Sequence, residues 1–195
     1  MPQPYKGSGW KSGMDALKAR PKLAAHIGTI AAMWSQIELQ LGILLALILQ
    51  ADAQIATAMY MRLKSETVRL AAIEAVAEEK LTDDLLEEYN TLGEKIRKTG
   101  SQRDTIMHGL WAIPDDNPES LVLIDPREFV TWASRAIGAH AKRSEGRGAG
   151  RADIHRTAPF ESALEYKESD FIDIQNRISE LLKEIYKFSA KVPRI

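Results

Sequence analysis

Three side chains near the middle of the chain have the chemistry that cleavage of a phosphodiester without a metal would need. Arg103, Asp104 and His108 lie within the segment 103–108. Such cleavage in RNA needs a group that takes the 2′-hydroxyl proton or protonates the leaving oxygen, and a cation against the phosphate. Histidine, with a reference pKa of about 6.5, suits the first task. The planar guanidinium of arginine suits the second.

The spacing of these residues limits how they can act together. On a regular helix, residues five apart are separated by roughly 140°, so Arg103 and His108 do not share a face. Asp104 and His108 are four apart and do share one, which lets Asp104 orient the imidazole or hold it charged. A site that uses Arg103 with His108 therefore needs a distorted helix or two copies of the segment meeting across a dimer.

The elements before this segment are predicted to be amphipathic helices. Over 22–50, large apolar residues recur at intervals of three and four, which is the stripe of a helix that buries one face. Asp52 is placed to cap a second helix and Ser65 to cap a third.

The helix that carries the candidate residues is predicted to begin after Thr82, where two aspartates suit the positive end of its dipole. Gly100 leaves two interpretations open. The helix continues through it, at a cost of about 1 kcal/mol relative to alanine, or it stops and restarts at Ser101. In either case Gly109 ends the helical stretch, so His108 lies in the last turn.

The pattern changes after this helix. Residues 110–113 and 121–124 flank a turn-rich stretch, which predicts a β-hairpin. Segment 129–137 fits either a strand or a short helix. The glycine-rich segment 143–151 is expected to be a mobile loop. Ser169 is expected to cap a last amphipathic helix.

These elements predict a mainly α fold, a helical bundle with a small β-hairpin inserted before the last helix. A single helical domain is expected over 14–195. Residues 1–13 are expected to form a flexible N-terminus, and 114–167 an insertion that contains the hairpin and a mobile basic loop.

Composition narrows the classes of function only slightly. The chain has 195 residues, with 26 Lys and Arg against 27 Asp and Glu, so whole-chain charge gives no indication of nucleic acid or membrane. The absence of cysteine excludes disulfides and thiolate zinc sites. The longest apolar run, 39–49, is shorter than the roughly 20 residues of a membrane span, and the N-terminus has no secretory core. A cytoplasmic protein without a membrane partner is expected.

Segment 103–108 resembles the ribonuclease motif of the HEPN family, in which Arg precedes His by four to six intervening residues and a polar residue often follows the Arg. Here four residues intervene and Asp104 follows Arg103. The flanking stretch 108–111, His-Gly-Leu-Trp, resembles the ending seen in bacterial relatives, and 34–38 resembles their first-helix pattern. The likeness covers about 22–113. The last helix matches only by its position in the order of the elements.

The resemblance implies a HEPN-like helical bundle and a metal-independent endoribonuclease without a cofactor. It implies a homodimer in which the motifs of two subunits face each other, with Arg103 binding phosphate, His108 transferring protons and Asp104 orienting His108. Several family members are toxins of toxin–antitoxin pairs or act in defence against phage, which would add an antitoxin partner. Others are non-catalytic modules that bind RNA or proteins, and this alternative stays open.

Structural interpretations compete with this one. The pairs Arg20 with His26 and Arg135 with His140 satisfy the same spacing, although neither Arg is followed by a polar residue. A histidine near a helix end commonly bonds a carbonyl or an acid, and Arg103 can simply pair with an acidic neighbour. The basic stretch 135–156 can neutralise phosphates or be a solvated loop. Three tryptophans can stack on bases, although core packing is favoured for them: Trp34, Trp111 and Trp132.

Overall fold

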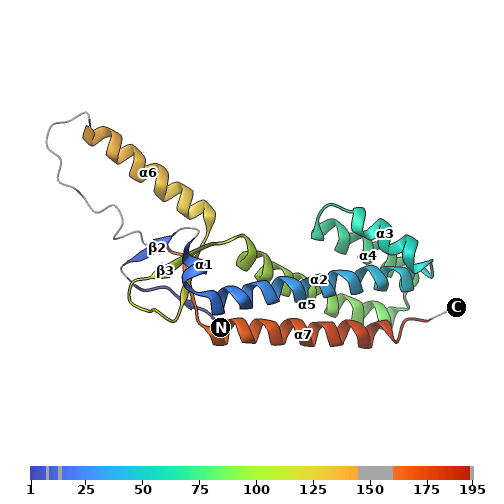
Figure 1. The fold of residues 1–195 in the computed structure, drawn as a ribbon. Coiled ribbons are helices and arrows are strands. Elements are labelled where there is room, and N and C mark those ends of the chain that lie inside the picture. Colours follow the sequence, from blue (N-terminus) through green and yellow to red (C-terminus); the bar gives the residue numbers. More distant parts are fainter. Residues whose placement is uncertain (8, 13–14, 145–159, 194–195) are drawn as a thin grey trace. The chain divides into compact units, whose positions relative to one another are not determined.

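The fold is mainly helical, with one small antiparallel sheet, as the computed structural model shows for residues 1–7, 9–12, 15–144 and 160–193 (Figure 1). The helices in these residues are α1 (Asp15–Ala19), α2 (Pro21–Leu49), α3 (Ala53–Arg62), α4 (Glu66–Lys80), α5 (Asp83–His108), α6 (Pro126–Ser144) and α7 (Glu168–Ser189). The strands are β1 (Gln3–Pro4), β2 (Trp10–Ser12), β3 (Leu110–Pro114), β4 (Leu121–Ile124) and β5 (Leu164–Tyr166). The predicted helical bundle and hairpin are therefore confirmed, and HEPN identity stays a prediction.

The chain divides into two compact units. The sheet unit comprises Met1–Gly28 and Asp104–Asp173, and the helical unit comprises Thr29–Arg103 and Ile174–Ile195. The single domain expected over 14–195 stays a prediction.

The helical unit is built on the apolar stripe of α2, as the sequence pattern predicts. Trp34, Ile37 and Leu44 are fully buried in it. Asp52 and Ser65 cap α3 and α4 as expected, because their side chains accept the backbone N–H groups three residues on, at 2.9 and 3.2 Å. Local capping chemistry thus fixes where these helices begin.

Helix α2 is long and apolar enough to cross a membrane, judged by length and composition alone. No other helix among the described residues is. Its most apolar window has a mean hydropathy of 1.6, and 44% of that window is buried inside the protein. The core helix of a soluble protein can have the same length and hydropathy, so these two properties of α2 are weak evidence for a membrane span. The cytoplasmic location stays a prediction.

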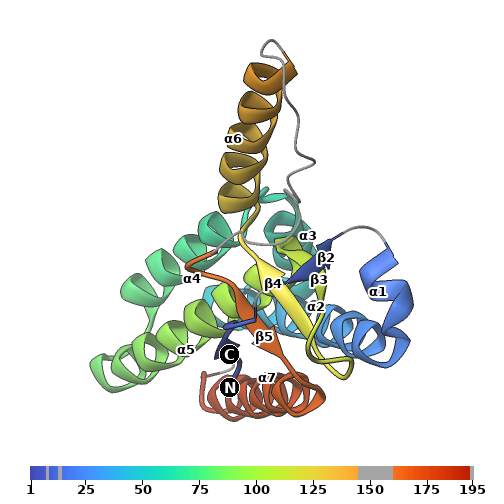
Figure 2. The same ribbon diagram turned by 90° about the vertical axis from the view of Figure 1, so that its left-hand side faces the viewer.

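The sheet unit holds five strands in the order β1-β5-β4-β3-β2, and every neighbouring pair is antiparallel (Figure 2). The predicted hairpin is its centre, with Leu110 opposite Ile124 and Trp111 opposite Leu123. Both faces are covered. Trp111 packs edge-on against Tyr166 on one face, while the side chains of Ala112, Val122 and Ile124 join the core of the other.

The N-terminal segment differs from the expectation of flexibility, because it contributes β1 and β2 to the sheet. Trp10 explains why. Its ring lies 5.3 Å from that of Phe160 and 5.6 Å from that of Trp132, in an aromatic cluster over the sheet. Burying such large rings stabilises a segment whose own sequence has no strong strand pattern.

Two further segments are settled by the structure. Segment 129–137, left open between strand and helix, is part of α6. The last helix begins at Glu168, and the predicted cap at Ser169 is wrong. Instead the Asp170 carboxylate accepts the backbone N–H of Lys167 at 2.9 Å, as in a capping box.

Residues 145–159 lie outside the described residues. Most of the expected mobile basic loop and His155 lie in this range.

Candidate functional site

Helix α5 continues through Gly100 without interruption and carries the candidate segment in its last turns. Of the two alternatives left open at Gly100, the continuous helix is therefore the one observed. A Cβ at Gly100 would lie 3.1 Å from Cζ2 of the buried Trp34 and would collide with the Glu66 carboxylate. Glycine is therefore needed because α2 and the start of α4 approach α5 closely here. Of the two alternatives, the stop at Gly100 with a restart at Ser101 does not occur.

Arg103 belongs to the helical unit and has a packing role there. Its side chain is half-buried, and its guanidinium carbon lies 6.0 Å from the centre of the Trp34 ring. An Arg over an indole face at this distance is a cation–π contact. Part of the Arg103 side chain is thus engaged with the core.

Asp104 and His108 belong to the sheet unit. Asp104 is half-buried and His108 is exposed. The last turn of α5 is regular, since the backbone N–H of Gly109 donates to the Thr105 carbonyl at 3.0 Å. Asp104 and His108 therefore lie one turn apart on the same side of α5, as predicted.

His108 lines a cavity of about 480 Å³ within the sheet unit. Its polar lining comes from Thr105, His108, Asp125, Arg127 and Ser162, and its apolar lining includes Leu123, Pro126 and Leu164. Of the predicted site residues that the structure describes, His108 alone lines it. A cavity with an apolar wall and a few convergent polar groups is typical of a small-molecule site.

Gly109 also lines the cavity, next to the end of α5. A Cβ at this position would collide with the Leu123 side chain, so glycine lets β4 approach the end of α5. The sequence marked Gly109 only as a helix stop.

Asp125 and Arg127 are the polar residues that the sequence analysis missed. Arg127 donates from Nε to Oδ1 of Asp125 at 3.1 Å and from Nη2 to Oδ2 at 2.7 Å, and its backbone N–H also donates to Oδ1 at 2.7 Å. These hydrogen bonds lower the pKa of Asp125 to about 2 and raise that of Arg127. The carboxylate therefore stays charged and holds the guanidinium in one orientation.

The hairpin register was the signal for this pair. Leu110 lies opposite Ile124, so the residue after Ile124 is brought beside the residue before Leu110. The register alone therefore places Asp125 next to Gly109 and the end of α5.

The other Arg–His spacings have different surroundings. His26 is half-buried, with Nε2 at 3.3 Å from Glu168 Oε1 and its ring stacked 6.2 Å from that of Phe171. Arg20 donates to the adjacent carbonyl of Ala19. Arg135 is an exposed residue of α6. The choice of the 103–108 segment over the other two spacings stays a prediction.

The tryptophans are mostly structural, as favoured. Trp34 is fully buried, and Trp111 is buried with its Nε1–H donating to the Ile106 carbonyl at 3.2 Å. Trp132 is half-buried in the aromatic cluster and stays partly accessible.

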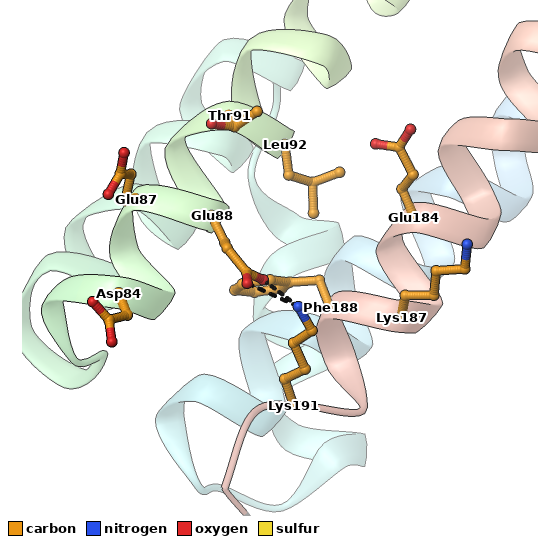
Figure 3. Close-up of a pocket in the computed structure, with 9 residues that line it drawn as sticks. All are labelled: Asp84, Glu87, Glu88, Thr91, Leu92, Glu184, Lys187, Phe188 and Lys191. Carbon is orange, nitrogen blue, oxygen red and sulfur yellow. Dashed lines mark hydrogen bonds and ion pairs between the residues drawn. The ribbon is translucent and has the colours of Figure 1, made fainter.

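A second cavity of about 500 Å³ lies within the helical unit, between α5 and α7 (Figure 3). Four acidic side chains and two lysines line it above an apolar floor of Leu92 and Phe188. Lys191 already spans part of it, with Nζ 2.8 Å from both carboxylate oxygens of Glu88. It holds no histidine and has no link to the motif.

No group of three or more His, Asp or Glu side chains in the described part of the chain is placed to hold a metal ion. Comparisons with protein-family models, curated proteins and solved structures find no match to this chain.

Proposed function

We propose that the chain is a HEPN-like, metal-independent endoribonuclease that acts on RNA as a homodimer. The observation that carries the proposal is the position of His108. It is exposed in the last turn of a long bundle helix, lines a cavity, and is separated from a short strand by Gly109 alone. This is the context in which the HEPN motif is expected.

The reaction needs no group beyond those that the chain supplies. The 2′-oxygen of a ribose attacks the adjacent phosphorus, the bond to the 5′-oxygen of the next nucleotide breaks, and a 2′,3′-cyclic phosphate and a free 5′-hydroxyl form. His108 takes the 2′-hydroxyl proton while water protonates the leaving oxygen, or His108 protonates the leaving oxygen while water takes the 2′-hydroxyl proton. Arg103 stabilises the negative charge that develops on the phosphate, and Asp104 orients the imidazole.

The regularity of α5 bears on the dimer. Because α5 is helical through His108, Arg103 and His108 point roughly 140° apart on it. Helix distortion is therefore not available to bring them together. The proposal is that Arg103 of one copy acts on the phosphate held by His108 of the second copy.

The setting of this activity is also proposed from the resemblance alone. A toxin or a phage-defence component would act in the cytoplasm, and a toxin would be held inactive by an antitoxin partner. A gene for a nucleotidyltransferase beside the gene for this chain would favour the toxin–antitoxin setting.

The test is cleavage of labelled RNA in excess chelator by the parent protein and by His108→Ala. His140→Ala is the matched control, because His140 belongs to the other four-residue spacing on α6. We expect the parent and His140→Ala to cut RNA, and His108→Ala to be inactive while keeping the parent's circular dichroism spectrum. Equal cleavage by His108→Ala and the parent refutes the proposal.

One observation favours a second candidate function, a non-catalytic HEPN-like module that binds RNA or a protein. The Arg103 guanidinium packs over Trp34, so Arg103 has a structural task that would persist without catalysis. This candidate predicts that RNA is bound but never cut, and that His108→Ala changes only affinity or stability.

A further inference from the structure

We infer that the cavity beside His108 is a nucleotide subsite, in which Arg127 binds the phosphate and the apolar wall of Leu123, Pro126 and Leu164 receives the base. This inference rests on the proposed function and deepens it. Neither Arg127 nor the apolar wall belongs to the motif at 103–108.

The size and composition of the cavity fit one nucleotide. Its volume of about 480 Å³ falls within the range of about 300–1,000 Å³ of small-molecule sites. The apolar wall offers a base a surface free of competing polar groups. The hydroxyls of Thr105 and Ser162 also line the cavity and suit the polar edges of a base or ribose.

The Arg127–Asp125 pair presents a cation in a fixed orientation. Asp125 engages the side of the guanidinium that carries Nε and Nη2. The edge that carries Nη1 forms no hydrogen bond with any of the described residues, and the Arg127 side chain is 91% exposed. An arginine held on one edge by a carboxylate can bind a phosphate with the other edge, in the fork geometry that it prefers.

The placement of both groups follows from the fold. His108 is the last residue of α5 and is separated from β3 by one residue. Asp125 directly follows β4, and Arg127 is the second residue of α6. The β3–β4 register sets these chain ends next to each other, so a nucleotide with its phosphate at Arg127 lies in the same cavity as the imidazole. Within one copy, Arg127 is then the cation that binds the phosphate beside His108. Arg103 would reach the phosphate from the second copy of the dimer.

The experiment measures binding of adenosine 3′-monophosphate and of inorganic phosphate to the full chain by calorimetry. We expect the parent to bind the nucleotide more tightly than phosphate. Arg127→Gln should weaken both ligands about tenfold, the loss of one charge-assisted contact. Leu164→Ala should weaken the nucleotide and leave phosphate unchanged, because it removes only the base contact.

Two control variants match these changes outside the cavity. Arg62→Gln removes an exposed arginine at the end of α3, and Leu182→Ala truncates a half-buried leucine of α7. Both should bind like the parent. Circular dichroism of every variant checks that the fold persists, and Arg127→Lys, which retains the charge, should recover part of the affinity.

Three results would overturn the inference: no nucleotide binding by the parent, equal affinity for nucleotide and phosphate, or unchanged binding by Arg127→Gln. Failure of the subsite is distinguishable from failure of the nuclease. Nucleotide binding with the expected variant pattern, but no RNA cleavage, leaves the subsite and removes the nuclease. Cleavage that depends on His108 but not on Arg127 or Leu164 leaves the nuclease and removes the subsite.

Discussion

Gly100→Ala should destabilise the protein, although alanine is the better helix former. In a solvent-exposed helix the change is worth about 1 kcal/mol in favour of alanine. Here the new methyl group would lie 3.1 Å from Cζ2 of Trp34, a side chain with no exposed surface, and would displace the Glu66 carboxylate. The flexible Glu66 side chain can move, but the Trp34 ring is held by the core. Overpacking of this kind costs about 1–3 kcal/mol, so a net loss of about 1 kcal/mol is expected.

Gly28→Ala is the matched control, because Gly28 is also inside a helix but nothing lies within 4 Å of a Cβ built there. It should stabilise the protein by up to about 1 kcal/mol. Urea denaturation, followed by circular dichroism, gives both free energies of unfolding. If Gly100→Ala stabilises the protein as much as Gly28→Ala does, the close approach of Trp34 to α5 is wrong.

Three further predictions test contacts in the two units. Trp111→Phe should lower the free energy of unfolding by about 1–3 kcal/mol, measured in urea, because it leaves the buried Ile106 carbonyl without its indole donor. Asp52→Ala should cost about 1 kcal/mol in the same assay, through loss of the α3 cap, and an unchanged value would contradict the capping role. Hydrogen bonds from Lys22 and His26 lower the pKa of Glu168 below its ordinary 4.5; the stabilisation is therefore complete above pH 4.5 and is lost as pH falls through the lower folded-state value. At neutral pH the melting temperature of Glu168→Gln should accordingly be lower than that of the parent. In acid the two melting temperatures should converge.

The features that were predicted correctly depend on residues close together in the chain. The caps at Asp52 and Ser65 need only a side chain and a backbone N–H three residues on. The hairpin needs two apolar runs and a turn. In both cases the sequence contains every group that decides the outcome.

The features that were missed depend on contacts between distant segments. The continuation of α5 through Gly100 was left open, and the close approach of Trp34 that requires glycine there comes from a helix far away in the chain. The ordered strands near the N-terminus depend on the packing of Trp10 on Phe160. The error at Ser169 has a different cause. Ser169 and Asp170 are adjacent and both have capping chemistry, and it is the Asp170 carboxylate that accepts the backbone N–H of Lys167.

In the candidate site, too, relations within one helix were predictable, whereas contacts between distant segments were not. The chain itself places Asp104 one turn before His108, so that relation was predictable from a helical period. Arg127 became visible only through strand pairing, because it lies two residues after Asp125, which directly follows the strand that pairs with β3. A motif read along one helix therefore omits the groups that the sheet brings to it.

The role of Arg103 can be separated from its packing with two substitutions. Arg103→Met keeps a long apolar side chain over the Trp34 ring and removes the charge, so the unfolding free energy should fall by no more than about 1–2 kcal/mol, the value of a cation–π contact. Cleavage should nevertheless be lost if Arg103 binds the scissile phosphate. Trp34→Phe makes the opposite change, since it weakens the core and keeps the cation. Cleavage by its folded fraction should stay near the parent value.

Both variants are compared by cleavage rate per folded molecule, with the folded fraction taken from urea denaturation. If activity follows stability alone in the two variants, Arg103 is a structural residue and has no part in the chemistry. In that case Arg127 is the cation of the sheet unit that remains beside His108, and the nuclease would not need a second copy to complete its site.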